Sequence, residues 1–163
     1  ATDDDVGCDL LRLIFTACHR VLSTDARVAL ILRLLGGLTT AEIARAYLTS
    51  EPTIQQRIVR AKRTLTEAQV QFELPRGDER AGRLASVLEV IYLIFNEGYQ
   101  ATEGERLIRQ ELCEEALRLG RILAGIAPDD PEVHGLSALM ELQSSRLAAR
   151  ADADSGEDAE DDV

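Results

Sequence analysis

Residues 34–65 constrain the fold of this chain more than any other stretch, because they combine two helical segments with a tight turn between them. Thr39 or Thr40 can cap a short helix over 41–47, and Ser50 can cap the longer helix that follows. The few residues between the two helices are enough for a turn and no more. This layout is typical of a helix-turn-helix, in which the second helix enters the major groove of DNA.

The second helix has two different sides. Ile54, Ile58, Ala61 and Leu65 recur at helical spacing and predict one buried stripe. Glutamine can pair with an adenine edge and arginine with a guanine edge, whereas threonine and further arginines suit phosphates. We predict that the DNA-binding residues are those away from the stripe, namely Thr53, Gln55, Gln56, Arg57, Val59, Arg60, Lys62 and Arg63. Of these, we assign Thr53 and Arg57 to phosphates.

A basic helix face is often only a solvated surface, and this alternative applies here as well. The basic run does not stand alone, however, because it follows a capped helix start and a turn of the right length. DNA binding is therefore the interpretation that explains more of the pattern.

The net charge of −11 does not suit a DNA-binding protein, but the charge is unevenly distributed over the 163 residues. Residues 151–163 carry many acids and no base, and Asp3, Asp4 and Asp5 lie near the start. Between residues 39 and 65 the basic side chains outnumber the acidic ones. Association with DNA depends on the local field at the docking face. We therefore expect acidic, solvated ends on either side of a basic centre.

The composition favours helices throughout the chain. Apolar residues make up 45% of it and aromatic residues only 4%, with no tryptophan, so the core must be aliphatic. Strands favour β-branched and aromatic residues, and this core suits helices better. Ser23 can cap a helix that Gly36-Gly37 ends. We expect helices over 9–21, 25–35, 41–47, from 51 onward, and over 83–96, 106–124 and 131–150.

The predicted fold class is all-α, with a four-helix helix-turn-helix domain followed by a small domain of about three helices. Pro75-Arg76-Gly77-Asp78 is a cluster of helix breakers and indicates the boundary. Asp130 is a candidate cap for the last helix. We divide the chain into a flexible segment 1–8, the helix-turn-helix domain 9–74, a linker 75–82, a helical extension 83–150 and an acidic disordered tail 151–163.

The cysteines and histidines give a weak case for a metal site. Cys8, Cys18 and His19 supply too few ligands for tetrahedral zinc, and the two cysteines lack a short paired spacing. We expect Cys18 in the core, where free cysteine is often buried, and no disulfide framework with Cys113. His134 fits a surface or capping role. We predict no metal site and no cofactor.

No catalytic arrangement emerges from the remaining polar residues. Glu114 and Glu115 are adjacent on a helix and point about 100° apart, so they do not converge. Glu97 has no nucleophile or base near it in the pattern. In the same segment Gly98 fits a left-handed helix stop with Tyr99 packed back, or alternatively a contact surface. We therefore predict no catalytic residue and no enzyme activity.

The segment LTTAEIARAYLTSEPTIQQRIVRAKRTL resembles the promoter-binding C-terminal region of bacterial sigma-70 family factors, of the extracytoplasmic-function (ECF) subfamily. The preceding LRLIFTACHRVLSTDARVALILRLLGG resembles the two helices that open that region. LEVIYLIFNEGYQAT and EALRLGRILAGIAPDDPEVHGLSALMEL resemble the helical extension of one subgroup. The last of these segments is also similar to a tetratricopeptide-type hairpin, although one hairpin is not a repeat array.

The resemblance implies binding to the −35 promoter element and to the β flap of RNA polymerase. It places Gln55, Gln56, Val59 and Arg60 at base edges, and polymerase contacts on the first two helices and the basic end around 60–63. A regulatory protein could bind the extension. The promoter-melting region that precedes this region in such factors has no counterpart here, so we expect a fragment.

Two other functions remain open from the sequence. The first is a stand-alone helix-turn-helix regulator, which needs a dimer to read two half-sites. The second is a helical interaction module whose DNA-binding face is masked by the acidic tail. No signal peptide or membrane span is visible, so we expect the cytoplasm and no membrane partner.

Overall fold

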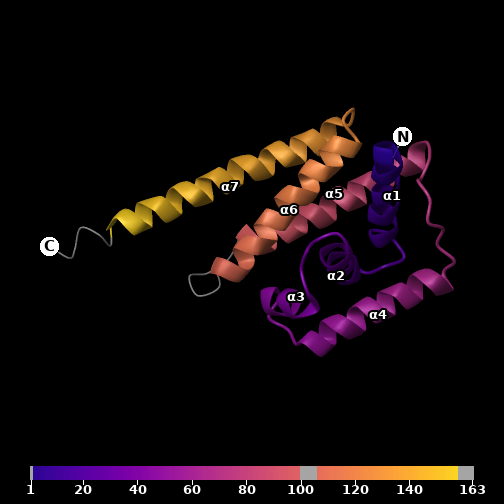
Figure 1. Cartoon of the computed structure of the whole chain (residues 1–163), viewed down its shortest axis with the longest axis horizontal. Coiled ribbons are helices and arrows are strands. Elements are labelled where there is room, and N and C mark those ends of the chain that lie inside the picture. Colours follow the sequence, from indigo (N-terminus) through magenta and orange to yellow (C-terminus); the bar gives the residue numbers. More distant parts are fainter. Residues whose placement is uncertain (1, 100–105, 158–163) are drawn as a thin grey trace.

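The computed structural model describes the backbone of residues 2–99 and 106–157, and within these ranges it contains seven helices and no strand (Figure 1). The predicted all-α class is confirmed. The helices are α1 (Thr2–Ala17), α2 (Thr24–Leu34), α3 (Thr40–Ala46), α4 (Glu51–Glu67), α5 (Asp78–Tyr99), α6 (Arg106–Ile126) and α7 (Pro131–Glu157).

The helix starts follow from local side-chain caps. Ser23 Oγ accepts the N–H of Ala26 and Ser50 Oγ accepts the N–H of Thr53, each at 3.3 Å. Thr39, not Thr40, caps α3: its hydroxyl accepts the Glu42 N–H, and the Glu42 carboxylate accepts the Thr39 N–H in return. Such reciprocal pairs satisfy two backbone donors that a helix start leaves open.

The turn of the helix-turn-helix contains an unusual residue. Leu48 adopts φ 53°, a left-handed conformation that favours glycine. The N–H of Thr49 bonds the Ala44 carbonyl at 2.9 Å, and that of Leu48 bonds the Arg45 carbonyl at 3.3 Å. This pair of bonds is a Schellman ending, which normally places glycine where Leu48 lies. The turn therefore depends on a strained residue whose side chain is 68% exposed.

Three segments expected to lack regular structure are helical in part. Helix α1 begins at Thr2, in the segment predicted to be flexible, and Gly7 there lies against Ile126 of α6. Helix α5 begins at Asp78, inside the predicted linker, directly after Gly77 at φ 60°. Acids in its first turn favour this start, because they complement the helix dipole.

At the other end, α7 continues to Glu157, into the predicted tail. No proline interrupts residues 151–157, and alanine has high helix propensity. Residues 158–163 lie outside the described residues.

The two halves of the molecule share one hydrophobic core. Helix α2 contacts α1, α3, α4 and α5, and α3 also contacts α6. All of 28–32 in α2 is buried, which fits a helix that is apolar on every side and enclosed by others. The extension therefore packs on the helix-turn-helix half, and the two do not form separate bodies.

Two arginines of the extension bond backbone carbonyls of the first half. Arg83 of α5 donates to the Phe15 carbonyl at 2.7 Å, and its guanidinium lies 5.7 Å from the centre of the Phe15 ring. Arg118 of α6 donates to the Leu35 carbonyl and to Glu115. Both carbonyls lie at helix C-termini, where acceptors lack partners within the helix.

Gly36 is needed for close packing rather than for a left-handed turn. A Cβ there would lie 2.6 Å from the Leu32 carbonyl oxygen and 3.1 Å from Glu115 Oε2. The prediction that α2 ends at the two glycines is confirmed. The prediction for Gly98 is wrong, because this residue is buried within α5, which continues to Tyr99. Tyr99 does pack back, with its ring stacked on Phe95 at 5.8 Å between centres.

Helix α7 uses fewer of its apolar residues than the hairpin pattern indicates. Among the described side chains of α7, Val133 and Met140 are buried, and Met140 fits against Gly120, where a Cβ would lie 2.9 Å from the Met140 Cε. Leu139 and Leu142 of the same helix are exposed.

Candidate DNA-binding surface

Helix α4 lies along one edge of the molecule, against α2 and α3 (Figure 1). Ile54, Ile58 and Ala61 are buried, and Leu65 is partly buried against the same core. The predicted stripe is confirmed. The helix is thereby fixed to its support on one side, and the other side faces solvent.

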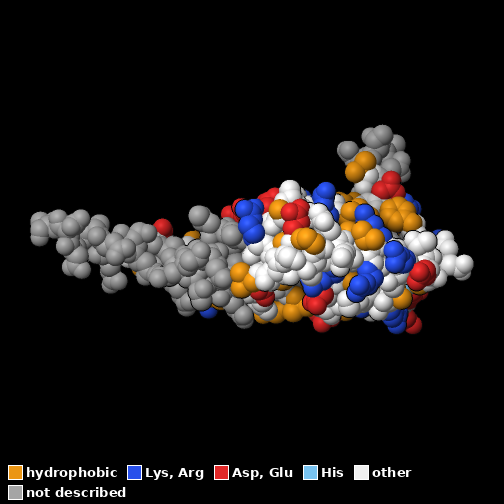
Figure 2. All heavy atoms as spheres, turned by 90° about the horizontal axis from the view of Figure 1, so that it is seen from below, with side chains coloured by type: hydrophobic (Ala, Val, Ile, Leu, Met, Phe, Trp, Pro, Cys, Tyr) orange, Lys and Arg blue, Asp and Glu red, His pale blue; other side chains and the backbone are white. Residues whose placement is uncertain are grey.

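The predicted site residues lie together on this outer part of α4. Their side chains are exposed except for Arg57, which is half-buried, and Val59 exposes 56% of its surface. Figure 2 shows Lys and Arg side chains gathered on the face that α4 presents. The exposed or half-exposed set is Thr53, Gln55, Gln56, Arg57, Val59, Arg60, Lys62 and Arg63.

A groove runs between α4 and the start of α2. It has a volume of about 410 Å³ and is lined on one side by residues 21–23, 25 and 26 and on the other by Gln56, Arg57 and Arg60, among others. Arg57 owes its partial burial to this neighbourhood, which sequence spacing alone does not indicate. The cationic face therefore extends from the exposed side of α4 into the groove between α4 and α2.

Glu51, the first residue of α4, is a polar residue at this surface that the sequence did not point to. Its Oε1 accepts a hydrogen bond from Thr40 Oγ1 at 3.0 Å and another from Gln55 Nε2 at 3.4 Å. The acid thus links the start of α3 to the outer face of α4. Its spacing of four residues from Gln55 was the only available signal.

The cysteines behave as core residues. Burial raises the pKa of the Cys18 thiol to about 12 and that of Cys113 to about 11. The Cys113 thiol donates to the Phe95 carbonyl at 3.6 Å. Cys18 in the core is as predicted. Within 2–99 and 106–157, no three His, Cys, Asp or Glu side chains come together in a group that could hold a metal ion.

The two histidines have local roles. His134 Nε2 donates to the Pro128 carbonyl at 2.6 Å, across the α6–α7 connection, which confirms the surface or capping role. His19 Nδ1 accepts the Val21 N–H at 3.1 Å. Burial lowers the pKa of His19, and the guanidinium of Arg83 lowers it further. A neutral ring is consistent with its role as an acceptor.

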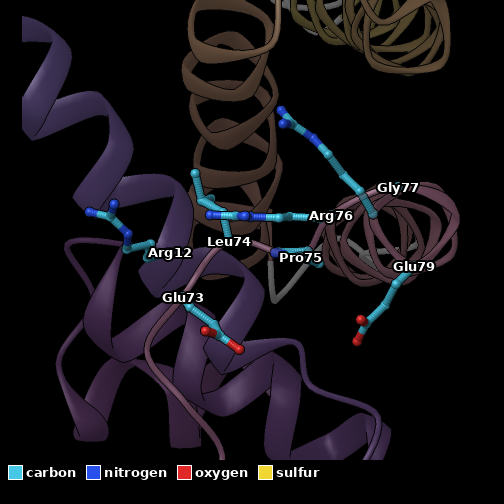
Figure 3. Close-up of a pocket in the computed structure, with 8 residues that line it drawn as sticks. Arg12, Glu73, Leu74, Pro75, Arg76, Gly77 and Glu79 are labelled. Atoms are coloured by element: carbon cyan, nitrogen blue, oxygen red, sulfur yellow. The ribbon is translucent and has the colours of Figure 1, made fainter.

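A pocket with a volume of about 840 Å³ lies where the α4–α5 connection passes α1 (Figure 3). Its charged lining side chains are of both signs and come from 73–80 and Arg12. In Figure 3 the side chain of Arg76 extends toward Leu74. These residue types offer no nucleophile with an adjacent base.

Comparison with known proteins agrees with this geometry. The sigma-70 region 4 family matches residues 12–65, which run from α1 to the end of the buried stripe of α4. Residues 12–65 are a sigma-70 region 4. This is a family of DNA-binding helix-turn-helix domains rather than of enzymes. The confirmed stripe, caps and turn are therefore those of a region 4.

The extension matches a different family. Residues 83–157 match a family of unknown function (DUF6596), which covers α5 from Arg83 through α7. An uncharacterized protein of Rhizobium meliloti (strain 1021) is 47% identical over 145 residues, which is 89% of this chain and 34% of that protein. The chain thus spans about a third of the length of this relative. No solved structure matches the chain. None of the described helices has the length and apolar character to cross a membrane.

Proposed function

We propose that this chain binds the −35 element of promoter DNA through α4 and takes part in transcription initiation as part of an ECF sigma factor. The observation that carries the proposal is the division of α4 into a buried aliphatic stripe and an exposed face of glutamine and arginine, within a sigma-70 region 4. Such a factor works in the cytoplasm, without catalysis by this chain.

The residues of α4 divide into two roles. Gln55, Gln56 and Arg60 supply hydrogen-bonding groups for base edges, and Val59 offers an apolar contact for a thymine methyl group. Thr53 and Arg57 bind phosphates on one side, and Arg57 does so from the groove beside α2. Lys62 and Arg63 add to the non-specific electrostatic attraction.

RNA polymerase is the proposed protein partner, through its β flap. The basic end of α4 around Arg60 and Arg63 is exposed and available for this contact. Helices α1 and α2 are also packed against α5, so the part of them that meets polymerase must be the part that the extension leaves uncovered. A regulatory protein could then act through the extension, which supports both helices.

The alternatives are a dimeric stand-alone regulator and an interaction module with a masked DNA-binding face. In Figure 1, α7 runs away from α4, which favours an accessible face over masking by residues 151–157. A dimeric regulator needs two half-sites in its target, whereas a sigma factor needs one asymmetric element.

Selection of bound duplexes from a random pool tests the proposal. The full chain should enrich one asymmetric motif, and affinity for it should fall steeply with salt. The double variant Gln56→Ala/Arg60→Ala should lose the enrichment, whereas Arg146→Ala, an exposed arginine of α7, should keep it. A palindromic motif would favour the dimeric regulator. No enrichment by the wild-type chain would refute DNA recognition.

A second measurement addresses polymerase. The isolated β flap should retain the full chain on a resin at moderate salt. Loss of retention with the charge reversal Arg63→Glu, and not with Arg146→Glu, would locate the contact at the end of α4. Absence of retention for the wild-type chain would contradict the polymerase part of the proposal.

A further inference from the structure

Glu51 is an acid at the start of a helix whose outer face is otherwise cationic. Helix α4 has two acids, Glu51 in its first position and Glu67 in its last. An acid in the first turn complements the helix dipole, and this alone would explain Glu51. The dipole does not explain why the carboxylate is held in one place, between two side chains from different helices.

The contacts of Glu51 fix the direction of a neighbouring side chain. Its Oε1 accepts from Thr40 Oγ1 at 3.0 Å and from Gln55 Nε2 at 3.4 Å. The hydroxyl of Thr39, the residue before Thr40, donates to Glu42 instead. The two neighbouring threonines at the start of α3 therefore donate to two different carboxylates. Because the amide nitrogen of Gln55 faces Glu51, the oxygen Oε1, which lies on the other side of Cδ in the same plane, points away from Glu51.

This end of α4 therefore offers hydrogen-bond acceptors. A carboxylate accepts and cannot donate, and the exposed atom of the Gln55 amide is likewise an acceptor. In the major groove, cytosine presents an amino donor alone, and adenine presents an amino donor beside its acceptor N7. Guanine presents N7 and O6 and thymine presents O4, all acceptors that a carboxylate repels. Two neighbouring acceptors therefore suit cytosine best, because the N7 of adenine would face one of them. The N-terminal residues of a recognition helix are those that contact base edges.

We infer that Glu51 is a specificity-determining residue that selects a cytosine amino group at one position of the DNA target. Thr40 is the positioning residue that holds the carboxylate, and Gln55 Oε1 adds a second acceptor beside it. This inference rests on the proposed function. Glu51 and Arg60 are about 13 Å apart along the helix at 1.5 Å per residue, so they read different base pairs.

The experiment is a duplex selection with the full chain at one fixed salt concentration, followed by affinity measurements on single-base variants of the selected site. Glu51→Gln should reduce the preference for cytosine at one base pair by roughly 5–100-fold, the range of one good base contact. It should also tighten binding to duplexes without that cytosine, because one repelling charge is gone. Thr40→Val should weaken the same preference, in part, at the same base pair.

Glu67→Gln is the matched control, since it removes the same charge from the same helix at its other end. It should leave every base preference unchanged. Melting temperatures of all variants separate a loss of folding from a loss of discrimination. The base pair affected by Glu51→Gln should differ from the one affected by Arg60→Ala.

Three results would overturn the inference. In the first, Glu51→Gln keeps the wild-type preference at every position. In the second, it weakens all positions equally, as general loosening of the helix would. In the third, the affected position prefers adenine, guanine or thymine on the strand that α4 contacts. A wild-type chain without any preference would instead refute the proposed function, and the inference with it.

Discussion

Helices α4 and α7 both lie at the edge of the molecule, but they divide their surfaces very differently. Helix α4 buries Ile54 and Ile58 and leaves one large aliphatic residue, Val59, on its exposed face. Helix α7 leaves Leu139 and Leu142 in solvent, the latter 65% exposed. A helix with one apolar stripe specifies its orientation by itself, whereas a helix with apolar residues on several sides does not.

This difference between α4 and α7 reflects the different structural roles of the two halves of the molecule. The first half presents the exposed polar and basic face of α4, and the buried stripe of the same helix holds that face in place. The extension supports the first half: α5 contacts α2, and α6 contacts α3. Arg83 of α5 and Arg118 of α6 each bond a backbone carbonyl of the first half. Helix α4 therefore depends on the extension indirectly, through α2 and α3.

The strongest test of the difference between α4 and α7 is to introduce a charge at one leucine or isoleucine position in each helix. Ile58→Asp should cost about 3–5 kcal/mol of unfolding free energy, because it places an unpaired charge in the core and leaves a cavity. Leu142→Asp should change stability by less than about 0.5 kcal/mol, since its side chain is already in water. Urea denaturation followed by circular dichroism measures both. An Ile58→Asp protein with wild-type helicity and midpoint would show that the stripe of α4 is not the core.

A charge removal tests the exposed faces of the same helices. Arg60→Ala should lose about 1–3 kcal/mol of discrimination at one base pair of the selected duplex, because arginine makes two bonds to a guanine edge. Arg146→Ala on α7 should leave discrimination unchanged. Competition binding against single-base variants gives the measurement. Equal behaviour of the two variants would mean that α4 has no special role in recognition.

The sequence predicted α4 better than it predicted the contacts between the halves, and the reason is distance along the chain. The caps at Ser23 and Ser50 join residues three apart, so composition and spacing reveal them. The hydrogen bond from Arg118 to the Leu35 carbonyl joins residues 83 apart, and no local sequence pattern predicts it.

Gly36 and Gly98 illustrate the same limit. The sequence predicts a helix stop at each position. Helix α2 does end before Gly36, but Gly36 also leaves room where Leu32 and Glu115 approach closely, and Gly98 lies inside α5. A glycine in a sequence does not indicate whether it ends a helix or leaves room for a neighbouring atom from a distant part of the chain.

The contact between the two halves can be weakened at Arg118 without changing the exposed face of α4 or of α7. Arg118→Ala should destabilise the chain by about 1–2 kcal/mol, because the Leu35 carbonyl loses its charged donor and Glu115 loses its partner. Arg121→Ala, which breaks the exposed ion pair with Glu141 at 2.6 Å, should cost less than about 1 kcal/mol. Urea midpoints compare the two. If Arg121→Ala proves the more damaging, then the α6–α7 pair, and not the junction with region 4, stabilises the extension.

The smallest expected effect concerns the turn that orients α4. Leu48 lies at φ 53°, where a side chain costs about 1–2 kcal/mol, and its side chain buries little in return. Leu48→Gly removes the strain but adds freedom to the unfolded chain, so the net gain should be about 0.5–1 kcal/mol. Leu48→Ala keeps the strain and serves as the control, with no gain expected. A glycine variant less stable than the alanine variant would mean that the Leu48 side chain makes contacts worth more than the strain. The turn would then belong to the core of region 4 rather than to its surface.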